Sequence, residues 1–274
     1  MRPALSSKPT KKWPAVHALR PENRTCWSSP ALPWYHFRMT SSQHDPAEEA
    51  KRKAAEWAVS QIEDGMAVGL GSGTTSALVI EEVGRRVASG LRITAIATSE
   101  KSHREAVSLS IPMTDFARQP KLDLTIDGAD EVEEGTLHLI KGHGGALLRE
   151  KIVAVASSRL LIAVDQRKLV KKLGSVFTVP VEVIPFGWET TAARLRDHGF
   201  APELRVNDDG KPYITDGKHY ILHCNLVPSG LTPEQAAVAL KQTVGVVEHG
   251  LFLGVTSQVV IGSADGIQIL AARS

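Results

Sequence analysis

Hydrophobic residues along this chain form short continuous runs that alternate with segments of helical spacing. The continuous runs hold four to seven residues, a length typical of buried strands, and lie at residues 66–70, 91–97, 122–126, 137–140 and 160–164. Apolar residues recur with the helical period in the segments between or before them, at residues 45–62, 77–87, 98–108 and 146–157. Strands that alternate with helices in this way predict an α/β fold with a doubly wound, mostly parallel sheet.

The pattern changes after residue 174. The next elements are a strand, a helix, two strands joined by a turn at residues 207–210, and a second helix at 232–243. This order predicts a smaller α+β insert of ferredoxin-like type. Apolar runs at 246–253, 258–261 and 267–270 would supply the closing strands. We therefore expect a sheet domain formed by residues 45–173 plus 254–274, with residues 174–253 as the insert domain and 1–44 as an extension.

Residues 1–40 lack any sustained hydrophobic period. They hold six prolines, three of the five tryptophans, seven of the 32 lysines and arginines, and one of the 30 acidic residues. Three interpretations stay open: a disordered or untranslated extension ahead of Met39, a transit peptide, and a functional arm. The prolines oppose the amphipathic helix of a transit peptide. A secretory signal is disfavoured because no continuous apolar segment follows the basic residues.

The basic residues of this segment give the full chain a positive net charge, although the rest of the chain is acidic. Without residues 1–40, 25 basic and 29 acidic residues remain, a net charge of −4 instead of +2. No basic face is visible, so we expect no nucleic-acid partner. No apolar run reaches about 18 residues, so we expect no membrane span. Cys26 and Cys224 show neither metal-ligand spacing nor a disulfide framework. We therefore predict a cytoplasmic protein, or an organellar one if residues 1–40 are a transit peptide.

The candidate chemistry is concentrated in residues 127–151. Asp127 ends one apolar run, Asp130 follows it, and Lys141 ends the next run. Glycines 142, 144 and 145 then precede a helical segment that contains Glu150. In open α/β sheets, ligands bind at the carboxyl ends of the strands, where these groups would lie. Each also has a structural alternative: Asp127 as a helix cap, the glycines as a turn, and Glu150 as a surface charge.

A second glycine-rich segment, residues 69–75, joins a strand to a helix. Its backbone N–H groups and hydroxyls suit a phosphate, although a tight structural turn explains it equally well. The dinucleotide-binding spacing is absent, because Thr74 or Ser76 stands where the third glycine would be. No Gly-Lys-Ser/Thr follows either, so a P-loop is excluded. The spacing therefore argues against a nucleotide-dependent oxidoreductase.

Six motifs in this order resemble the type A ribose-5-phosphate isomerases: GLGSGTT, TSEKS, TIDGADEV, KGHGGALLREKIVA, VDQRKLVKKLG and PVEVIPFGW. The resemblance runs from about residue 45 to the C-terminus. It implies an aldose–ketose isomerase of the non-oxidative pentose phosphate pathway that interconverts D-ribose 5-phosphate and D-ribulose 5-phosphate. It also implies that the reaction needs no metal and no organic cofactor, and that the chain forms a homodimer or homotetramer.

The resemblance also assigns roles by motif. Glu150 matches the general base, Asp127 an acid linked to ring opening, and Asp130 and Lys141 groups that orient hydroxyls and stabilise an oxyanion. The backbone N–H groups of residues 142–145 match an oxyanion hole. The substrate-binding positions implied are Ser72, Gly73, Thr74, Thr75, Asp127, Gly128, Ala129, Asp130, Lys141, Gly142, His143, Gly144, Lys168 and, on the first helix, Lys51.

Two departures from the family pattern stand out. His143 occupies a position that is usually glycine, and GSGTT replaces the more usual GTGST. We expect the histidine to be tolerated without becoming a catalytic group. The alternative of a different class is a non-catalytic sugar-phosphate sensor on the same fold. The acids, Lys141 and the lack of an evident helix-turn-helix domain favour the enzyme.

Overall fold

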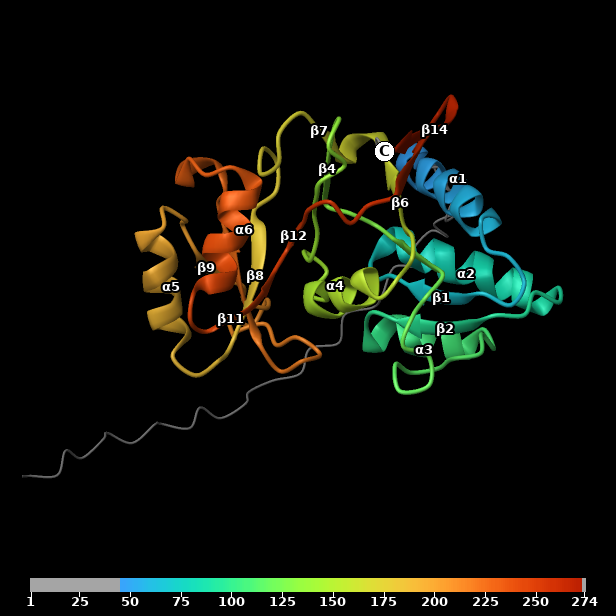
Figure 1. Ribbon diagram of the computed structural model, residues 1–274, viewed down its shortest axis with the longest axis horizontal. Helices are drawn as coiled ribbons and strands as arrows, with labels where there is room; N and C mark the ends of the chain where they lie inside the picture. Colours follow the sequence, from blue (N-terminus) through green and yellow to red (C-terminus); the bar gives the residue numbers. More distant parts are fainter. Residues whose placement is uncertain (1–44, 273–274) are drawn as a thin grey trace, which may run out of the picture. The chain divides into compact units, whose positions relative to one another are not determined.

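The computed structural model describes residues 45–272. The interpretations of residues 1–44 lie outside the described residues. Figure 1 labels the elements in chain order.

A six-stranded sheet in the order β14-β13-β6-β3-β1-β2 is the main framework. Its strands are β1 (Ala67–Leu70), β2 (Thr94–Ala97), β3 (Leu124–Asp127), β6 (Leu160–Asp165), β13 (Gln258–Ser263) and β14 (Gly266–Ala271). All neighbours pair in parallel except β13 and β14. The short apolar runs form these strands because both faces of the sheet are covered, which leaves few positions for polar side chains. The predicted doubly wound, mostly parallel sheet is confirmed.

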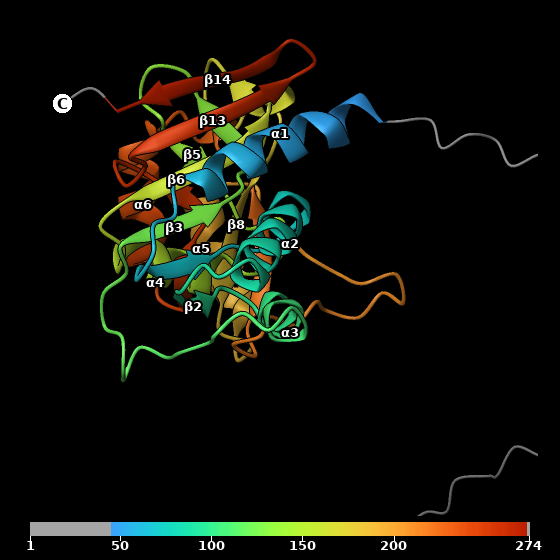
Figure 2. The same cartoon turned by 90° about the vertical axis from the view of Figure 1, so that its right-hand side faces the viewer.

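Helices cover the two faces of this sheet. Figure 2 shows α1 (Pro46–Ser60), α2 (Thr74–Ala88) and α3 (Glu100–Ser108) on one side of the strands. They share a core with Val68 and Ala95. From α4 (Leu147–Val155), Val153 packs instead on the neighbouring strand residues Ala67 and Ile96. Because successive strand residues point to opposite faces, α4 covers the other side of the sheet.

A second sheet, in the order β11-β8-β10-β9, is antiparallel throughout. It comprises β8 (Val179–Val183), β9 (Glu203–Leu204), β10 (Tyr220–Cys224) and β11 (Val246–His249). With α5 (Trp188–Asp197) and α6 (Pro233–Gln242) it encloses its own hydrophobic core (Figure 1). The chain order β-α-β-β-α-β and this strand order are ferredoxin-like, as predicted. The domain boundaries at residues 174 and 253 stay a prediction.

A third, smaller sheet was not predicted. It has the order β12-β5-β4-β7 and consists of β4 (Glu131–Glu133), β5 (Leu139–Ile140), β7 (Leu169–Val170) and β12 (Leu251–Phe252). The single strand predicted at 246–253 is wrong, because β11 and β12 lie in different sheets. The chain divides at Gly250, where a Cβ atom would lie 2.1 Å from the carbonyl oxygen of Lys141.

Two further differences concern chain segments near the strand ends. The second helix begins at Thr74 and not at residue 77, so the glycine-rich segment leads directly into its first turn. Between α3 and β3, Met113 forms only an isolated bridge with Ala95, so residues 111–114 add no strand to the sheet. Two short 3₁₀ helices, η1 (Gln166–Lys168) and η2 (Val227–Ser229), complete the described elements.

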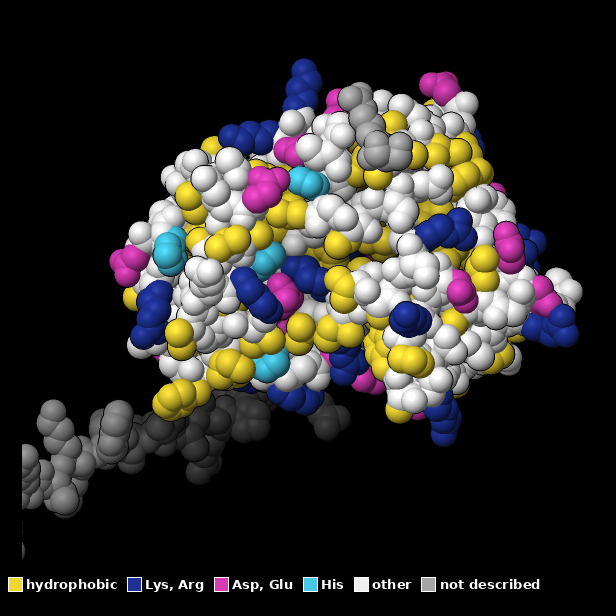
Figure 3. Space-filling view, in the orientation of Figure 1, with side chains coloured by type: hydrophobic (Ala, Val, Ile, Leu, Met, Phe, Trp, Pro, Cys, Tyr) yellow, Lys and Arg dark blue, Asp and Glu magenta, His cyan; other side chains and the backbone are white. Residues whose placement is uncertain are grey.

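The surface seen in Figure 3 carries lysine, arginine, aspartate and glutamate side chains of both signs scattered among one another. Within residues 45–272, no helix combines the length and the hydrophobicity needed to cross a membrane.

Candidate active site

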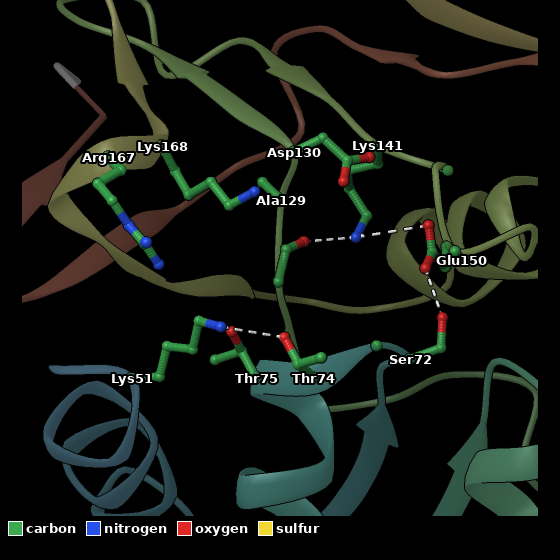
Figure 4. A pocket seen from close by; sticks show the side chains of 14 residues that line it. Lys51, Ser72, Thr74, Thr75, Ala129, Asp130, Lys141, Glu150, Arg167 and Lys168 are labelled. Atoms are coloured by element: carbon green, nitrogen blue, oxygen red, sulfur yellow. Dashed lines mark hydrogen bonds and ion pairs between the residues drawn. The ribbon is translucent and has the colours of Figure 1, made fainter. Parts of the chain in front are cut away.

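A cavity of about 160 Å³ opens at the carboxyl ends of β1, β3 and β6. Figure 4 shows the side chains around it. Its lining residues come from five separate segments of the chain: Lys51, Ser72, Gly73, Thr74, Thr75, Gly128, Ala129, Asp130, Lys141, Gly142, Gly144, Glu150, Arg167 and Lys168.

One end of the cavity is formed by the turn from β1 into α2. Gly73 is the N-cap of α2, so the N–H groups of Thr74 and Thr75 belong to the unpaired donors at the helix start. The ammonium of Lys51, on α1, donates to Thr74 Oγ1 at 3.3 Å. Lys168 reaches the same end from η1 (Figure 4). Cations and free amides at a helix N-terminus form a binding site for an anion.

The other end contains a buried cluster of opposite charges. Asp127, Lys141 and Glu150 have side-chain exposures of 1%, 3% and 4%. Lys141 Nζ lies 2.9 Å from Asp127 Oδ2 and 3.5 Å from Glu150 Oε2, and it donates to the carbonyl oxygen of Gly128 at 2.5 Å. Asp127 ends β3, Lys141 follows β5, and Glu150 is in the first turn of α4. Three elements therefore bring their charges to one point.

The two oxygens of Glu150 differ in their surroundings. Oε1 accepts a 2.6 Å hydrogen bond from the Ser72 hydroxyl. Oε2 is buried and has no hydrogen-bond partner among the described residues; the Lys141 ammonium at 3.5 Å is its ion-pair partner. A buried polar atom without a hydrogen bond is costly, and native proteins rarely keep one without a function. Glu150 Oε2 therefore has an unused acceptor position at which it can take a proton.

Burial sets the protonation of this cluster. Desolvation raises the pKa of Glu150 to about 7, against the opposing effect of Lys141, and Asp127 adds to the increase. Burial also disfavours the charged form of Lys141, but the carboxylates of Asp127 and Glu150 outweigh it and raise the pKa of the ammonium. The lysine therefore stays charged while the glutamate titrates near neutral pH.

Asp127 lies beneath the lining of the cavity. Its Oδ1 accepts hydrogen bonds from the backbone N–H groups of Ser72 and Gly128, at 3.2 and 2.7 Å, and from the Ser76 hydroxyl at 3.1 Å. Gly71 permits this approach, since a Cβ atom there would lie 2.0 Å from the same oxygen. The carboxylate thus joins the end of β1 to the end of β3.

The glycine-rich loop 142–145 connects β5 to α4, and His143 points away from the cavity. Its backbone N–H donates to Asp130 Oδ2 at 3.0 Å, and its ring nitrogen Nε2 lies 2.9 Å from the carbonyl oxygen of Thr178. His143 is not among the residues with positive φ, so its backbone suits a side chain. The expectation that histidine is tolerated here agrees with this geometry.

The structure gathers most of the positions predicted for the site. Among the lining residues are all of them except Asp127, which is buried behind Lys141, and His143, which faces the second sheet. Arg167 also lines the cavity and was not predicted. Its guanidinium pairs with Asp165 at 2.8 Å, at the end of β6. The available signal was its place two residues after a strand that ends in aspartate.

Comparison with known proteins identifies relatives that match most of the chain. The family model described as ribose 5-phosphate isomerase A (phosphoriboisomerase A) matches residues 94–266. The chain is 47% identical over 225 residues to a ribose-5-phosphate isomerase A of Synechococcus sp. (strain JA-3-3Ab), covering 82% of this chain and 97% of the relative. It is 50% identical over 220 residues to the ribose-5-phosphate isomerase A of Gloeobacter violaceus, covering 80% of this chain and 95% of that relative.

Solved structures agree with these relatives. The ribose 5-phosphate isomerase A of Methanocaldococcus jannaschii superposes with a TM-score of 0.78 at 36% identity, covering 82% of this chain and 99% of that one. A D-ribose-5-phosphate isomerase in complex with phospho-erythronic acid superposes with a TM-score of 0.78 at 34% identity. The superposition covers 82% of this chain and 99% of that one. Sequence, fold and the matched region together show that the chain belongs to the ribose 5-phosphate isomerase A family.

Proposed function

We propose that Glu150 is the general base of an aldose–ketose isomerase that interconverts D-ribose 5-phosphate and D-ribulose 5-phosphate in this cavity. The observation that carries the proposal is the buried Oε2 of a carboxyl group whose pKa is raised to about 7, an oxygen that accepts no hydrogen bond from the described residues. A base with a pKa near the working pH combines ionisation with useful basicity.

The reaction moves one proton between adjacent carbons. Glu150 removes the proton from C2 of the open-chain aldose, and the electron pair displaced from the C1 carbonyl gives a cis-enediolate. The carboxyl group returns the proton to C1, while the C2 oxygen becomes the carbonyl and the hydroxyl proton passes to the C1 oxygen. No electron leaves the sugar, so the step needs no external oxidant.

Lys141 and the glycine-rich loop are proposed to stabilise the enediolate. The lysine keeps its charge in a buried site, where a fixed cation acts strongly on a developing oxyanion. Gly142 and Gly144 also line the cavity, and their backbone N–H groups are proposed as further donors to the oxyanion. Phospho-erythronic acid, bound by the structural relative, carries a carboxylate and a phosphate and so resembles such an intermediate in charge at both ends.

The phosphate is proposed to bind at the opposite end, between α1, α2 and η1. Lys51 and Lys168 supply charge there, and Thr74 and Thr75 supply hydroxyls and helix N–H groups. Arg167 is a further candidate, although Asp165 holds part of its guanidinium.

The two aspartates are proposed to serve the sugar itself. Asp130 lines the cavity and can orient hydroxyls. Asp127 does not line it, and both its oxygens are occupied. We therefore propose that Asp127 takes part in ring opening through Lys141, the lining group that it contacts.

The test is conversion of ribose 5-phosphate to ribulose 5-phosphate, in the presence of EDTA, by residues 39–274 and by the full chain. Activity of both supports a metal-free isomerase that does not require residues 1–38. Two folded but inactive proteins would instead favour the sugar-phosphate sensor.

We also propose that the chain forms a homodimer or homotetramer through an apolar patch on the second sheet. Ile184, Phe186 and Val244 are 41%, 93% and 74% exposed. The backbone N–H of Ile184 donates to Gly245 at 2.9 Å, which brings Val244 beside the end of β8. Adjacent exposed apolar side chains are typical of a protein contact surface. The proposed partner is a second copy of this chain.

The compartment is proposed to be the cytoplasm, or an organelle if residues 1–40 act as a transit peptide. Cys224 is a free, buried thiol, and unpaired cysteines are usual in a reducing compartment. Fluorescent fusions of the full chain and of residues 39–274 would separate the two locations.

A further inference from the structure

Glu131, in the DGADEV motif, is fully buried but does not line the cavity. Its carboxylate accepts three backbone hydrogen bonds from the segment before β8: from Gly174 at 2.6 Å, Val176 at 2.7 Å and Phe177 at 2.6 Å. Charge-assisted hydrogen bonds of this kind are short and strong. The backbone that carries Phe177 is therefore fixed to the strand that follows Asp130.

The ring of Phe177 lies between two residues of the site region. Lys168 Nζ is placed over the ring, 4.7 Å from its centroid. The imidazole of His143 meets the same ring edge to face, at 4.9 Å and 69°. His143 is itself held by the Thr178 carbonyl and by the ring of His223, 4.8 Å away. The phenyl ring of Phe177 is thus in contact with both His143 and Lys168.

Lys168 has no other polar restraint. Among the described residues, its ammonium makes no hydrogen bond and no ion pair, whereas Lys51 donates to Thr74 and Lys141 pairs with two carboxylates. A flexible lysine on the wall of a cavity loses side-chain entropy when it binds an anion. A cation–π contact reduces that loss because it restricts the ammonium before the anion arrives.

We propose that Phe177 is a positioning residue that places Lys168 for the phosphate group of the substrate, with Glu131 fixing its backbone and His143 its ring. The inference rests on the proposed function, since it takes the Lys168 end of the cavity as the phosphate end. It gives a role to His143, whose position is usually glycine in the family that this sequence resembles.

The test compares Phe177→Leu with two matched variants of the full chain. Phe177→Leu keeps an apolar side chain but removes the ring face, and Phe177→Tyr keeps the face. Phe200→Leu makes the same change in a buried phenylalanine of the same hydrophobic core. We expect Phe177→Leu to raise the KM for ribose 5-phosphate, and the calorimetric Kd for inorganic phosphate, about two- to five-fold. Phe177→Tyr should restore both values, and Phe200→Leu should lower only the melting temperature.

A double-mutant cycle separates positioning from a general effect of packing. If Phe177 acts through Lys168, adding Phe177→Leu to Lys168→Met leaves KM and the phosphate Kd as they are in Lys168→Met alone. Equal increases in both backgrounds, or no increase in Phe177→Leu, would overturn the inference. Unchanged phosphate affinity in Lys168→Met would also overturn it.

Phosphate calorimetry keeps this inference apart from the proposed reaction, because it needs no turnover. A wild-type protein that binds phosphate but does not isomerise ribose 5-phosphate would refute the proposed function. The double-mutant cycle of Phe177 and Lys168 could still be measured through the phosphate Kd. Glu131→Gln is the supporting variant. It replaces a charged acceptor by an amide and should raise the phosphate Kd at least as much as Phe177→Leu.

Discussion

At the scale of single residues, the environment of Glu150 differs from the one that its neighbours in the sequence suggest. On sequence alone it stands between Arg149 and Lys151, as in an ordinary charged helix surface. In the structure its side chain is 4% exposed and contacts Ser72 and Lys141. The preceding residue, Arg149, instead forms an ion pair with Glu100. Burial therefore raises the pKa of Glu150 above that of an ordinary exposed glutamate, and this difference underlies its proposed role as a base.

Glu150→Gln should lower kcat by at least about 100-fold, since general base catalysis contributes roughly 10²–10⁴-fold. KM should change little, because the phosphate end of the cavity is untouched. Steady-state kinetics of the purified variant, with circular dichroism as the check on folding, measure both values. Wild-type kcat in the folded variant would remove Glu150 from the base role.

The pH dependence follows from the raised pKa of Glu150. The base must be ionised to accept a proton. We therefore expect kcat/KM to be low at acidic pH and to rise with pH through an apparent pKa near 7. Ser72 donates to the carboxylate and so favours the ionised form. Ser72→Ala should therefore move the acid limb to higher pH.

The matched control for the pH profile is Ser108→Ala, whose serine is exposed on α3. It should leave the acid limb in place. An acid limb near pH 4.5 in the wild type, or an unmoved limb in Ser72→Ala, would contradict the assignment of the titrating group to Glu150.

Lys141 should contribute strongly to stability as well as to activity. Lys141→Met would leave Asp127 and Glu150 buried without their cation, and breaking a buried pair in this way costs about 3–5 kcal/mol. Urea denaturation measures the free energy of unfolding. Lys101→Met, which removes an exposed ammonium 3.7 Å from Glu105, should change it by less than about 0.5 kcal/mol. If Lys141→Met and Lys101→Met lowered the free energy of unfolding by equal amounts, the buried cluster would not be stabilising.

At the scale of elements, the site depends on how closely β1 and β3 approach at their carboxyl ends. The backbone N–H of Ser72, after β1, donates to the Asp127 side chain at the end of β3, and Ser102 of α3 donates to the Gly71 carbonyl oxygen at 2.8 Å. Two strands and one helix therefore fix the same turn. Its geometry sets both the direction of Asp127 and the start of α2.

Gly71→Ala should disrupt this arrangement. The new Cβ atom would lie 2.0 Å from Asp127 Oδ1 and 2.7 Å from its Cα atom, so the two strand ends must separate. We expect a loss of about 1–3 kcal/mol in stability and a large loss of kcat. Gly210→Ala is the control, because it introduces a positive-φ alanine into open space at a cost of roughly 1–2 kcal/mol. Its kcat should match the wild type. Full activity of a folded Gly71→Ala protein would contradict this account.

At the scale of the whole described molecule, the site depends on contacts that cross between sheets. The backbone N–H of Lys141 donates to Gly250 at 2.9 Å, and that of Gly250 donates to Pro180 of β8 at 2.7 Å. Lys151, next to Glu150, donates to the His249 carbonyl oxygen of β11 at 2.6 Å. The second sheet therefore anchors both Lys141 and α4.

Assembly is the prediction that belongs to this scale. Light scattering should give the mass of two or four chains for the wild type, and Phe186→Asp should shift it towards a single chain, because a charge would be buried in the apolar contact. Val107→Asp, on the exposed side of α3, is the matched control and should not change the mass. Unchanged assembly in Phe186→Asp would move the interface away from the patch of Ile184, Phe186 and Val244.

The sequence by itself determined the features that depend on local pattern. Short apolar runs predicted the strands of the main sheet because a strand buried on both faces needs no polar positions. Motif spacing placed Asp127, Asp130, Lys141 and the glycine-rich turns at strand ends. The resemblance to the isomerases then assigned those groups their proposed roles.

Only the tertiary structure decided which side chains meet. Spacing gave no reason to prefer Glu150 as a buried base over a surface charge, since its pKa depends on contacts with residues about 10 to 80 positions away. The division at Gly250 and the small sheet around β4 and β5 were equally hidden. Two-residue strands carry no periodicity, and the close approach to Lys141 exists only once distant segments have packed. The role proposed for Phe177 was hidden for the same reason, because its contacts with Lys168 and His143 exist only in the folded chain.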